Sequence, residues 1–443
     1  MSAPDPILDL LPAHILVRLS PWLQAAGWVV GFSGGLDSTV LLHALVTQAR
    51  RGGCPPVSAI HVHHGLQPAA DDWPEHCAWA CAALSVPLSI RRVKVEPGAS
   101  LEAAARAARY AAFVDALEPG QILLTAQHRD DQAETLLFRL LRGAGVLGMA
   151  AMPSQRALGQ GWLVRPLLDR GRDELERYAR AAGLEWVEDP SNQDVRFARN
   201  YLRQAVMPVL GQRWPKAANA LARSAAHMRD AQELLDELAQ QDLARAHLRP
   251  FDWLDVPCLD LEVLRALSPP RQRNALRYWL APLTALPDTE HWGGWESLRD
   301  AALDATPLWQ LAGGVLQRSG MRAWWVDEQW HRLHPEQDWL NPSQALPLEG
   351  NGALHIEGRP PAGSLRVRYR VGGERMRMEG RGARDLKRLF NEQGIPGFLR
   401  GRLPLLFSGE ELLAVANLPG LDGPRGGEWR LRWSPPTNDQ RLS

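Results

Sequence analysis

Residues 28–51 of the chain read WVVGFSGGLDSTVLLHALVTQARR. The apolar run Trp28–Phe32 has the length and composition of a buried strand, and apolar residues recur with helical spacing from Val40 onward. Between them, two adjacent glycines remove the Cβ atoms that would keep a ligand off the backbone, so several N–H groups can point at one anion. The positive end of the helix dipole adds to this attraction. The pattern predicts a strand, a phosphate-binding turn and a helix.

The turn at residues 33–38, SGGLDS, differs from a Walker-type phosphate loop, because no Gly-Lys-Ser/Thr follows and it contains no lysine. Asp37 stands in the turn instead, which indicates that a magnesium ion supplies positive charge beside the phosphate. The alternative is a turn in which Ser33 or Asp37 only caps the helix. The complete hexapeptide, placed between a strand and a helix, favours phosphate binding.

The same hexapeptide resembles the pyrophosphate loop of the N-type ATP pyrophosphatases, the PP-loop superfamily. Members of that superfamily cleave ATP between the α- and β-phosphates and attach AMP to a substrate oxygen. The resemblance implies that the turn binds the pyrophosphate portion of ATP through Ser33, Gly34, Gly35, Leu36, Asp37 and Ser38.

Composition limits the remaining choices. With 443 residues the chain is long enough for about three domains. Lys and Arg together number 50, as do Asp and Glu, so only the distribution of charge bears on partners. No apolar stretch approaches the roughly 20 residues that cross a bilayer, and the N-terminus lacks the pattern of a signal peptide. We therefore expect a cytoplasmic protein without a membrane partner.

The four cysteines are expected to be free thiols. Cys77 and Cys81 share a helix face, but no second pair at metal-ligand spacing accompanies them. Cys54 and Cys258 are isolated in the sequence. No cysteine stands near the SGGLDS turn, and this bears on function because sulfur-transferring relatives generally need a catalytic or cluster-binding cysteine.

The first part of the chain alternates strand and helix patterns. Strands are predicted over 28–32, 57–62, 88–95 and 121–126, with helices over 72–85 and 100–117. This alternation predicts an α/β fold with a doubly wound parallel sheet, which binds ligands at the carboxyl ends of its strands. The motifs SGGLDS, HVHHG and AQHRDD all follow strands, so we expect them at one edge of the sheet.

The motif at residues 126–135, AQHRDDQAET, has two interpretations. Asp131 and Glu134 have the spacing of a capping box at the start of a helix over 131–142. His128 and Asp130, however, would remain on a loop facing the phosphate turn. Carboxylates beside a nucleotide commonly hold magnesium, which favours a metal or acid–base role for Asp130 or Asp131. We do not predict a metal site at His61, His63 and His64.

Residues 126–145, AQHRDDQAETLLFRLLRGAG, resemble the bacterial tRNA(Ile)-lysidine synthetases specifically. Three later motifs strengthen the resemblance: RPLL at 165–168, WVEDPSN at 186–192 and RFARNYLR at 196–203. In the last motif Arg196, Arg199, Asn200 and Arg203 are expected on one face of a helix. An asparagine among arginines suits phosphate or base contacts.

Two further domains are predicted beyond the catalytic domain at 1–210. Residues 211–345 show mainly helical periodicity and are expected to bind tRNA or substrate; Trp324 and Trp325 fit a short buried strand, and residues 331–363 resemble a linker. Residues 346–443 are predicted to form a small α/β domain. Between Arg366 and Arg402 this domain has 11 Lys and Arg against 4 Asp and Glu, which indicates RNA binding. The motif ARDLKRLF at 383–390 resembles the family's C-terminal domain.

The resemblance implies ATP-dependent joining of L-lysine to C2 of the wobble cytidine, position 34, in tRNA(Ile) with a CAU anticodon. The reaction passes through an adenylated cytidine and changes the codon and amino-acid identity from Met to Ile. Magnesium is expected on Asp37 with one of Asp130 and Asp131, and Asp131 is the preferred second ligand. The expected catalytic residues are Asp37, His128, Asp130, Asp131, Arg199 and Arg203, of which the arginines steady phosphate charge or hold the anticodon loop. A homodimer is compatible with the sequence.

Three rival functions use parts of the same pattern. A PP-loop tRNA thiolase activates its substrate in the same way, but the chain lacks a suitably placed Cys-x-x-Cys. An amidating ligase needs an ammonia source and has no use for a basic C-terminal domain. A non-catalytic RNA-binding module does not need the intact SGGLDS and HRDD motifs.

Overall fold

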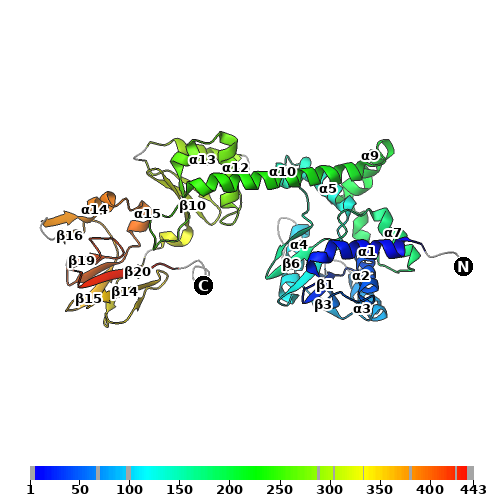
Figure 1. Ribbon diagram of the computed structural model, residues 1–443, viewed down its shortest axis with the longest axis horizontal. Helices are drawn as coiled ribbons and strands as arrows, with labels where there is room; N and C mark the ends of the chain where they lie inside the picture. The colour runs from blue at the N-terminus through cyan, green and yellow to red at the C-terminus, as the bar shows by residue number, and fades with distance from the viewer. Residues whose placement is uncertain are drawn as a thin grey trace. The chain divides into compact units, whose positions relative to one another are not determined.

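The computed structural model describes residues 5–65, 70–95, 101–286, 290–302, 305–332, 334–378, 382–424 and 427–436. The chain forms two compact units, Met1–Leu234 and Leu235–Ser443. The boundary between them lies within the long helix α10 (Ala217–Ala246), which is drawn in green in Figure 1. No helix in the described ranges is long and apolar enough to cross a membrane.

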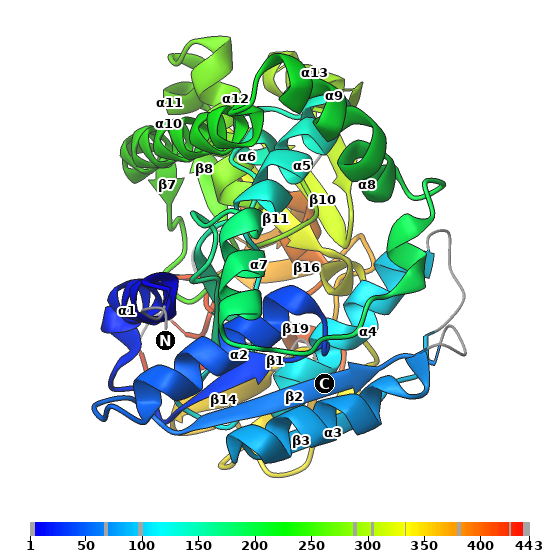
Figure 2. The ribbon, with the colours of Figure 1, turned by 90° about the vertical axis from the view of Figure 1, so that its right-hand side faces the viewer.

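The first unit is built on a six-stranded sheet with the order β3-β2-β1-β4-β6-β5. Its strands are β1 (Gly27–Gly31), β2 (Val57–His63), β3 (Leu88–Arg92), β4 (Gln121–Leu124), β5 (Gln155–Leu158) and β6 (Gly161–Val164). All neighbouring pairs are parallel except β5 with β6. Figure 2 shows β1, β2 and β3 side by side. The predicted doubly wound parallel sheet is confirmed, and the β5–β6 hairpin at its edge is an addition.

Helices cover both faces of this sheet because side chains along each strand alternate between the faces. Trp28 and Val30 pack with α1 (Ile7–Leu19), α2 (Leu36–Ala49), α3 (Trp73–Leu84) and α7 (Arg172–Ala181). Val29 faces the other way and packs with Phe113 of α4 (Leu101–Ala116). The apolar strands are thus buried on both sides, and polar groups gather where the strands end.

A helical layer follows the sheet in the first unit. It consists of α5 (Arg129–Leu140), α6 (Val146–Met149), α8 (Ala198–Tyr201), a π-helical turn η4 (Leu202–Val206) and α9 (Met207–Arg213). Helix α5 begins two residues before the predicted start at 131, because His128 rather than Asp131 is its N-cap. The capping box is formed by His128 with Asp131, so the predicted pairing of Asp131 with Glu134 in that role is wrong.

The second unit begins with the predicted helices and a sheet that was not predicted. Helices α11 (Leu261–Arg265), α12 (Pro269–Leu280) and α13 (Gly293–Asp300) accompany an antiparallel sheet with the order β7-β8-β11-β10-β9. These strands are β7 (His247–Leu248), β8 (Cys258–Asp260), β9 (Leu308–Leu311), β10 (Gly314–Ser319) and β11 (Arg322–Asp327). Trp324 and Trp325 are buried in β11, as predicted.

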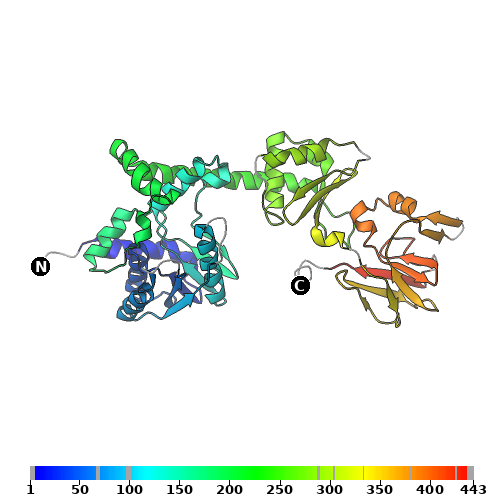
Figure 3. The ribbon, with the colours of Figure 1, turned by 180° about the vertical axis from the view of Figure 1, so that it is seen from behind.

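The C-terminal part of this unit contains three small sheets, of which Figure 3 shows the strands in yellow to red. The first joins β12 (Gln337–Trp339), β15 (Leu365–Arg368), β18 (Leu405–Ser408) and β19 (Glu411–Val415); the second joins β13 (Leu346–Pro347), β14 (Ala353–Gly358) and β20 (Trp429–Ser434). The third is the hairpin of β16 (Arg375–Met378) and β17 (Gly382–Asp385), followed by α14 (Leu386–Glu392) and α15 (Gly397–Arg400). Because β12, β13 and β14 lie within 331–363, the predicted linker is wrong. Trp339 and Leu354 of these strands are buried in the core.

Candidate active site at the carboxyl edge of the parallel sheet

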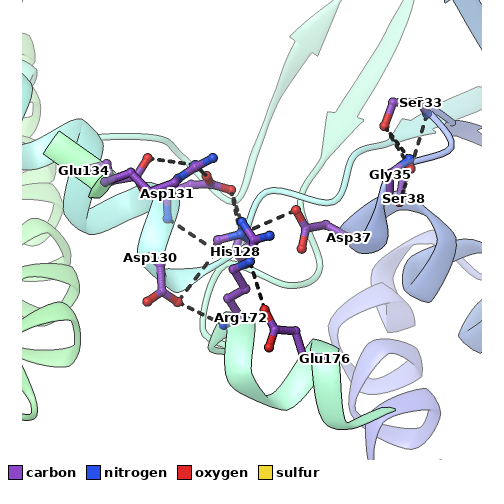
Figure 4. A network of polar contacts seen from close by, with 11 residues as sticks. Ser33, Gly35, Asp37, Ser38, His128, Asp130, Asp131, Glu134, Arg172 and Glu176 are labelled. Carbon is purple, nitrogen blue, oxygen red and sulfur yellow. Dashed lines mark hydrogen bonds and ion pairs between the residues drawn. The ribbon is translucent and has the colours of Figure 1, made fainter. Parts of the chain in front are cut away.

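Three helix N-termini meet beyond the carboxyl ends of the parallel strands (Figure 4). Helix α2 follows β1, α5 follows β4, and α7 starts at Arg172. Each of the three contributes a polar side chain or a backbone N–H to one network. The expected convergence of the SGGLDS and AQHRDD motifs is therefore present in the structure.

Gly34 gives the phosphate turn its shape. Its φ of +81° lies in the left-handed region, and a Cβ on this residue would stand 2.9 Å from Cγ2 of Val187. The carbonyl oxygen of Gly34 accepts a hydrogen bond of 2.9 Å from the backbone N–H of Val187. The segment after α7 thus packs on the turn, at a distance that only glycine allows.

The two serines of the motif hold the turn together from inside. Their hydroxyl oxygens are 3.0 Å apart, and the Ser38 hydroxyl donates to the carbonyl oxygen of Gly35 at 3.0 Å. The Ser38 hydroxyl oxygen also accepts from the N–H of Ser33 at 3.3 Å. These bonds preorganise the backbone for a ligand.

The start of α2 offers unpaired donors. Gly35 is the N-cap and provides no side-chain cap, and among the described residues no hydrogen bond occupies the N–H groups of Leu36, Asp37 or Ser38. The first N–H groups of a helix need an acceptor, and an anion of phosphate type satisfies them and interacts favourably with the helix dipole. The predicted phosphate site therefore has the required geometry.

His128 is the centre of the polar network. Its side chain is 1% exposed, and its Nε2 lies 3.6 Å from Oδ2 of Asp37 and 3.5 Å from Oδ2 of Asp131. Nδ1 of the neutral ring accepts from the N–H of Asp131 at 3.4 Å and lies 3.7 Å from Oδ2 of Asp130. Burial lowers the pKa of His128, but the three carboxylates outweigh burial, so that its pKa is raised.

The pKa of Asp37 is lowered, whereas that of His128 is raised. Burial raises the pKa of Asp37, but the nearby His128 ring, with Arg172 and Arg203, lowers it further than burial raises it. Asp37 is therefore ionised at neutral pH. Within the described chain, its buried Oδ1 has no hydrogen-bond partner, which fits an oxygen that receives a cation or a water.

Asp130 and Asp131 differ in their surroundings. Asp130 accepts from the backbone N–H of Arg172 at 3.0 Å and so docks the start of α7 on α5. Asp131 uses both oxygens: Oδ2 accepts from the N–H of His128 at 3.0 Å, and Oδ1 accepts from Nη2 of Arg203 at 3.0 Å. Of the three aspartates, Asp37 is the one whose free oxygen best suits Mg²⁺.

Arg203 joins the network through Glu134, a residue whose ion pair was not predicted. Nε and Nη2 of Arg203 donate to the two oxygens of Glu134 at 2.7 and 2.9 Å. Burial raises the pKa of Glu134, whereas the pKa of Arg203 is raised by its carboxylate partners despite burial. The π-helical turn containing Arg203 changes the register of the helix at this point.

The predicted stripe of Arg196, Arg199, Asn200 and Arg203 does not form a single face. Because α8 begins at Ala198, Arg196 precedes the helix, where it pairs with Asp194 at 2.6 Å. Nδ2 of Asn200 donates to backbone carbonyls of the preceding loop, at Ser191 and Asp194. The predicted single face is therefore wrong for Arg196, which precedes the helix, whereas Asn200 lies on the helix and uses its amide within the protein. Arg199 makes no ion pair within the described residues and stays available for a ligand.

The cysteines are free, as predicted, and none has the properties of a reactive thiolate. Burial raises the pKa of Cys77 to about 12, of Cys81 to about 11 and of Cys258 to about 12. Burial also raises the pKa of Cys54. The expectation that no cysteine lies near the SGGLDS turn is wrong in space: Sγ of Cys77 is 3.3 Å from Nδ1 of His61 and 3.1 Å from where a Cβ of Gly34 would stand.

Comparison with protein families agrees with this geometry. Residues 13–210 match the family model of the PP-loop domain. The fold and the site thus define a PP-loop enzyme, a class that uses ATP. Residues 259–324 match the TilS substrate binding domain, and residues 365–433 match the TilS substrate C-terminal domain.

Relatives extend the match to the full chain. A tRNA(Ile)-lysidine synthase of Pseudomonas syringae is 60% identical over 435 residues, which cover 98% of each chain. The corresponding protein of Pseudomonas fluorescens is 60% identical over 440 residues and 99% of each chain. That of Escherichia coli O157:H7 is 41% identical over 398 residues, 88% of this chain and 91% of the relative. The chain belongs to the tRNA(Ile)-lysidine synthase family.

Proposed function

We propose that this enzyme joins L-lysine to C2 of the wobble cytidine of tRNA(Ile) with a CAU anticodon, using ATP and Mg²⁺. The observation that carries the proposal is the set of open N–H groups at the start of α2, beside a carboxylate with an unpartnered oxygen. Family membership and the two matched substrate domains support tRNA as the second substrate.

In the first step the C2 oxygen of the cytidine attacks the α-phosphorus of ATP. A bond forms between this oxygen and phosphorus, and the bond from phosphorus to the bridging oxygen of the β-phosphate breaks. The leaving diphosphate stays on the N–H groups of Leu36, Asp37 and Ser38, which stabilise the charge that develops on it. The product is a cytidine carrying AMP on its C2 oxygen.

In the second step an amine of lysine attacks C2. The new C–N bond forms, the C2–O bond breaks with release of AMP, and the attacking amine loses a proton. A carboxylate can take this proton, since Asp37, Asp130 and Asp131 all lie around His128 at this edge of the sheet. We assign the role to Asp130, which makes one hydrogen bond, through Oδ2, among the described residues.

Mg²⁺, when bound, neutralises part of the phosphate charge, and Asp37 would hold it through Oδ1. Among the described residues no three His, Cys, Asp or Glu side chains form a metal-binding group. The remaining ligands would then come from ATP and water. Both oxygens of Asp131, the expected second ligand, accept hydrogen bonds, from the N–H of His128 and from Arg203, so Asp37 is the aspartate to which we assign the metal.

The C-terminal cations divide into paired and exposed groups. On β15, Arg366 pairs with Asp338 at 2.6 Å, and Arg368 pairs with Glu410 at 3.1 Å. These two carboxylates lie outside residues 366–402 and were not counted there. The positive charge that remains unpaired in the folded domain is therefore smaller than the count along the sequence indicates. Exposed cations remain on β16 and α14, where we assign contact with RNA phosphates to Arg375, Arg377 and Lys387.

Sulfur transfer is the main alternative for an RNA-modifying PP-loop enzyme. It requires a nucleophilic or cluster-binding thiolate. The raised pKa values of Cys77, Cys81 and Cys258 disfavour such a role. Lysine transfer needs no thiol.

The test is incorporation of radiolabelled lysine into a tRNA(Ile) transcript, with pyrophosphate release measured in parallel. The proposal predicts that pyrophosphate release requires ATP and the tRNA, and that lysine incorporation requires ATP, the tRNA and lysine. Pyrophosphate release with sulfur rather than lysine incorporation would replace the proposal with a thiolase. Absence of both would leave an RNA-binding protein.

A further inference from the structure

Five arginines lie close enough to act on one another electrostatically beside the site but take no part in its ion-pair network. They come from separate elements: Arg106 of α4, Arg139 of α5, Arg156 of β5, Arg165 after β6 and Arg199 of α8. None of the five forms an ion pair within the described ranges of the chain, although the same unit contains many arginine–carboxylate pairs. We call this group the arginine cluster.

Tyr110 and neutral acceptors hold the cluster in place. The guanidinium carbons of Arg106 and Arg156 each lie 4.9 Å from the centre of the Tyr110 ring. Arg165 is 3% exposed and donates to Oε1 of Gln127 at 3.1 Å and to the carbonyl of Pro153 at 2.8 Å. Gln127 precedes His128, so the cluster adjoins the catalytic network.

Arg139 is fixed in the same manner. Its Nη1 donates to the carbonyl oxygens of Gly148 and Ala151 at 2.8 and 2.9 Å. Burial lowers the pKa of Arg139, and the charges of Arg199 and Arg106 lower it further. Burial also lowers the pKa of Arg165; the Tyr110 side chain opposes this shift, and the charges of Arg156 and Arg106 add to it.

Such an arrangement is unfavourable without a counter-charge. Cations held at short range in a partly buried site repel one another, and carbonyl and amide acceptors do not neutralise them. A bound anion would remove this repulsion. The arginines lie on or next to helices and strands of one unit. The fold therefore fixes where their guanidinium groups stand, unlike those of mobile surface side chains.

The three substrates of the proposed reaction differ in their fit. The phosphates of ATP have their own donors at the start of α2, after β1, whereas β5 and β6 lie beyond β4 in the sheet. Free lysine carries two ammonium groups against one carboxylate, so five cations repel it. An RNA strand presents several phosphates in succession, and these match several arginines.

We propose that the arginine cluster binds the sugar–phosphate backbone of the RNA next to the modified cytidine. Arg106, Arg156 and Arg199 contact the phosphates. Arg165, which is buried, and Arg139, whose Nη1 is bonded to backbone carbonyls, add positive charge behind them. This subsite guides the cytidine toward His128 and Asp37. The proposal rests on the proposed function and extends it to a named surface.

The experiment compares Arg106→Gln and Arg156→Gln with Arg180→Gln, a matched control on α7 whose side chain is 77% exposed. For each variant, KM for a tRNA(Ile) transcript is measured over a series of salt concentrations. KM for ATP and KM for lysine are measured at a single salt concentration. Each cluster variant should raise KM for the RNA about 5- to 10-fold and reduce the slope of log KM against log salt by about 0.7. The control should leave both unchanged, and Arg156→Lys should largely restore them.

Unchanged KM and slope for the RNA in both cluster variants would overturn the proposal, as would an increase confined to ATP or lysine. These results are distinguishable from failure of the proposed function, which would appear as no lysine incorporation by the unsubstituted enzyme. Thermal unfolding of each variant within about 2 °C of the control shows that the fold is retained.

Discussion

Nε2 of His128 lies 3.6 Å from Oδ2 of Asp37, although 91 positions separate the two residues in the chain. His128 caps α5, and Asp37 lies in the first turn of α2. Their proximity follows from the parallel pairing of β1 with β4, which brings the two following helix starts to one edge of the sheet. The contact links the phosphate turn to the carboxylates of the second motif.

Asp37→Asn should abolish pyrophosphate release while leaving tRNA binding intact. The amide keeps the size of the side chain but removes the charge that would hold Mg²⁺, so we expect a loss of about 100-fold or more in rate. Asp173→Asn, an exposed carboxylate at the start of α7, is the control. Equal loss of RNA affinity and of rate would mean that Asp37 maintains the fold rather than the chemistry.

Gly34→Ala should impair ATP binding through backbone strain and through steric contacts of the new Cβ. The left-handed conformation costs a non-glycine residue about 1–2 kcal/mol, and the new Cβ would meet Val187 Cγ2 at 2.9 Å. Adding Val187→Ala removes the shortest contact but neither the strain nor the contacts with Cys77 Sγ and His76 Cδ2 at 3.1 and 3.2 Å, so the double variant should recover part of the affinity. Equilibrium binding of an ATP analogue measures both effects. Full recovery would assign the whole loss to the steric contact.

Much of this arrangement could be predicted because it is local in sequence. The strand, turn and helix at residues 28–51 form from adjacent residues, and β2, β3, β4 and their crossover helices follow the predicted alternation. The meeting of Asp37 with His128 follows from topology, since the carboxyl ends of parallel strands share an edge. No longer-range information was needed for these features.

Other features depend on residues far apart in the chain. Glu134 fits a capping box by spacing, but its partner Arg203 is 69 residues away, and only the fold reveals the pair. The partners of Arg366 and Arg368 lie on other strands or turns, so the sequence overstates the free positive charge of that region. The strands within 331–363 are short and bounded by prolines and glycines, which made the region resemble a linker.

Arg203→Met should destabilise the first unit by about 3 kcal/mol. The substitution leaves the Glu134 carboxylate, 5% exposed as a residue, without its bidentate partner. Combining it with Glu134→Gln removes the uncompensated charge and should recover part of the loss. Urea unfolding measures the free energies. A single variant as stable as the unsubstituted protein would show that water compensates Glu134.

His128 predicts a specific pH dependence of stability. Its pKa is raised above the ordinary value of 6.5, so its contribution is fully present below that value and is lost as the pH rises through the folded-state pKa. The difference in unfolding free energy between the unsubstituted protein and His128→Asn should therefore shrink as the pH is raised from 5.5 to 8.5. A difference that grows with pH would mean that the ring is neutral when folded.

A crystal structure with a non-hydrolysable ATP analogue and Mg²⁺ would show directly where the nucleotide binds. The β- and γ-phosphates should accept hydrogen bonds from the N–H groups of Leu36, Asp37 and Ser38, with the metal on Asp37 Oδ1. A triphosphate bound elsewhere, with the start of α2 empty or closed by side chains, would mean that residues 33–38 are not the ATP site.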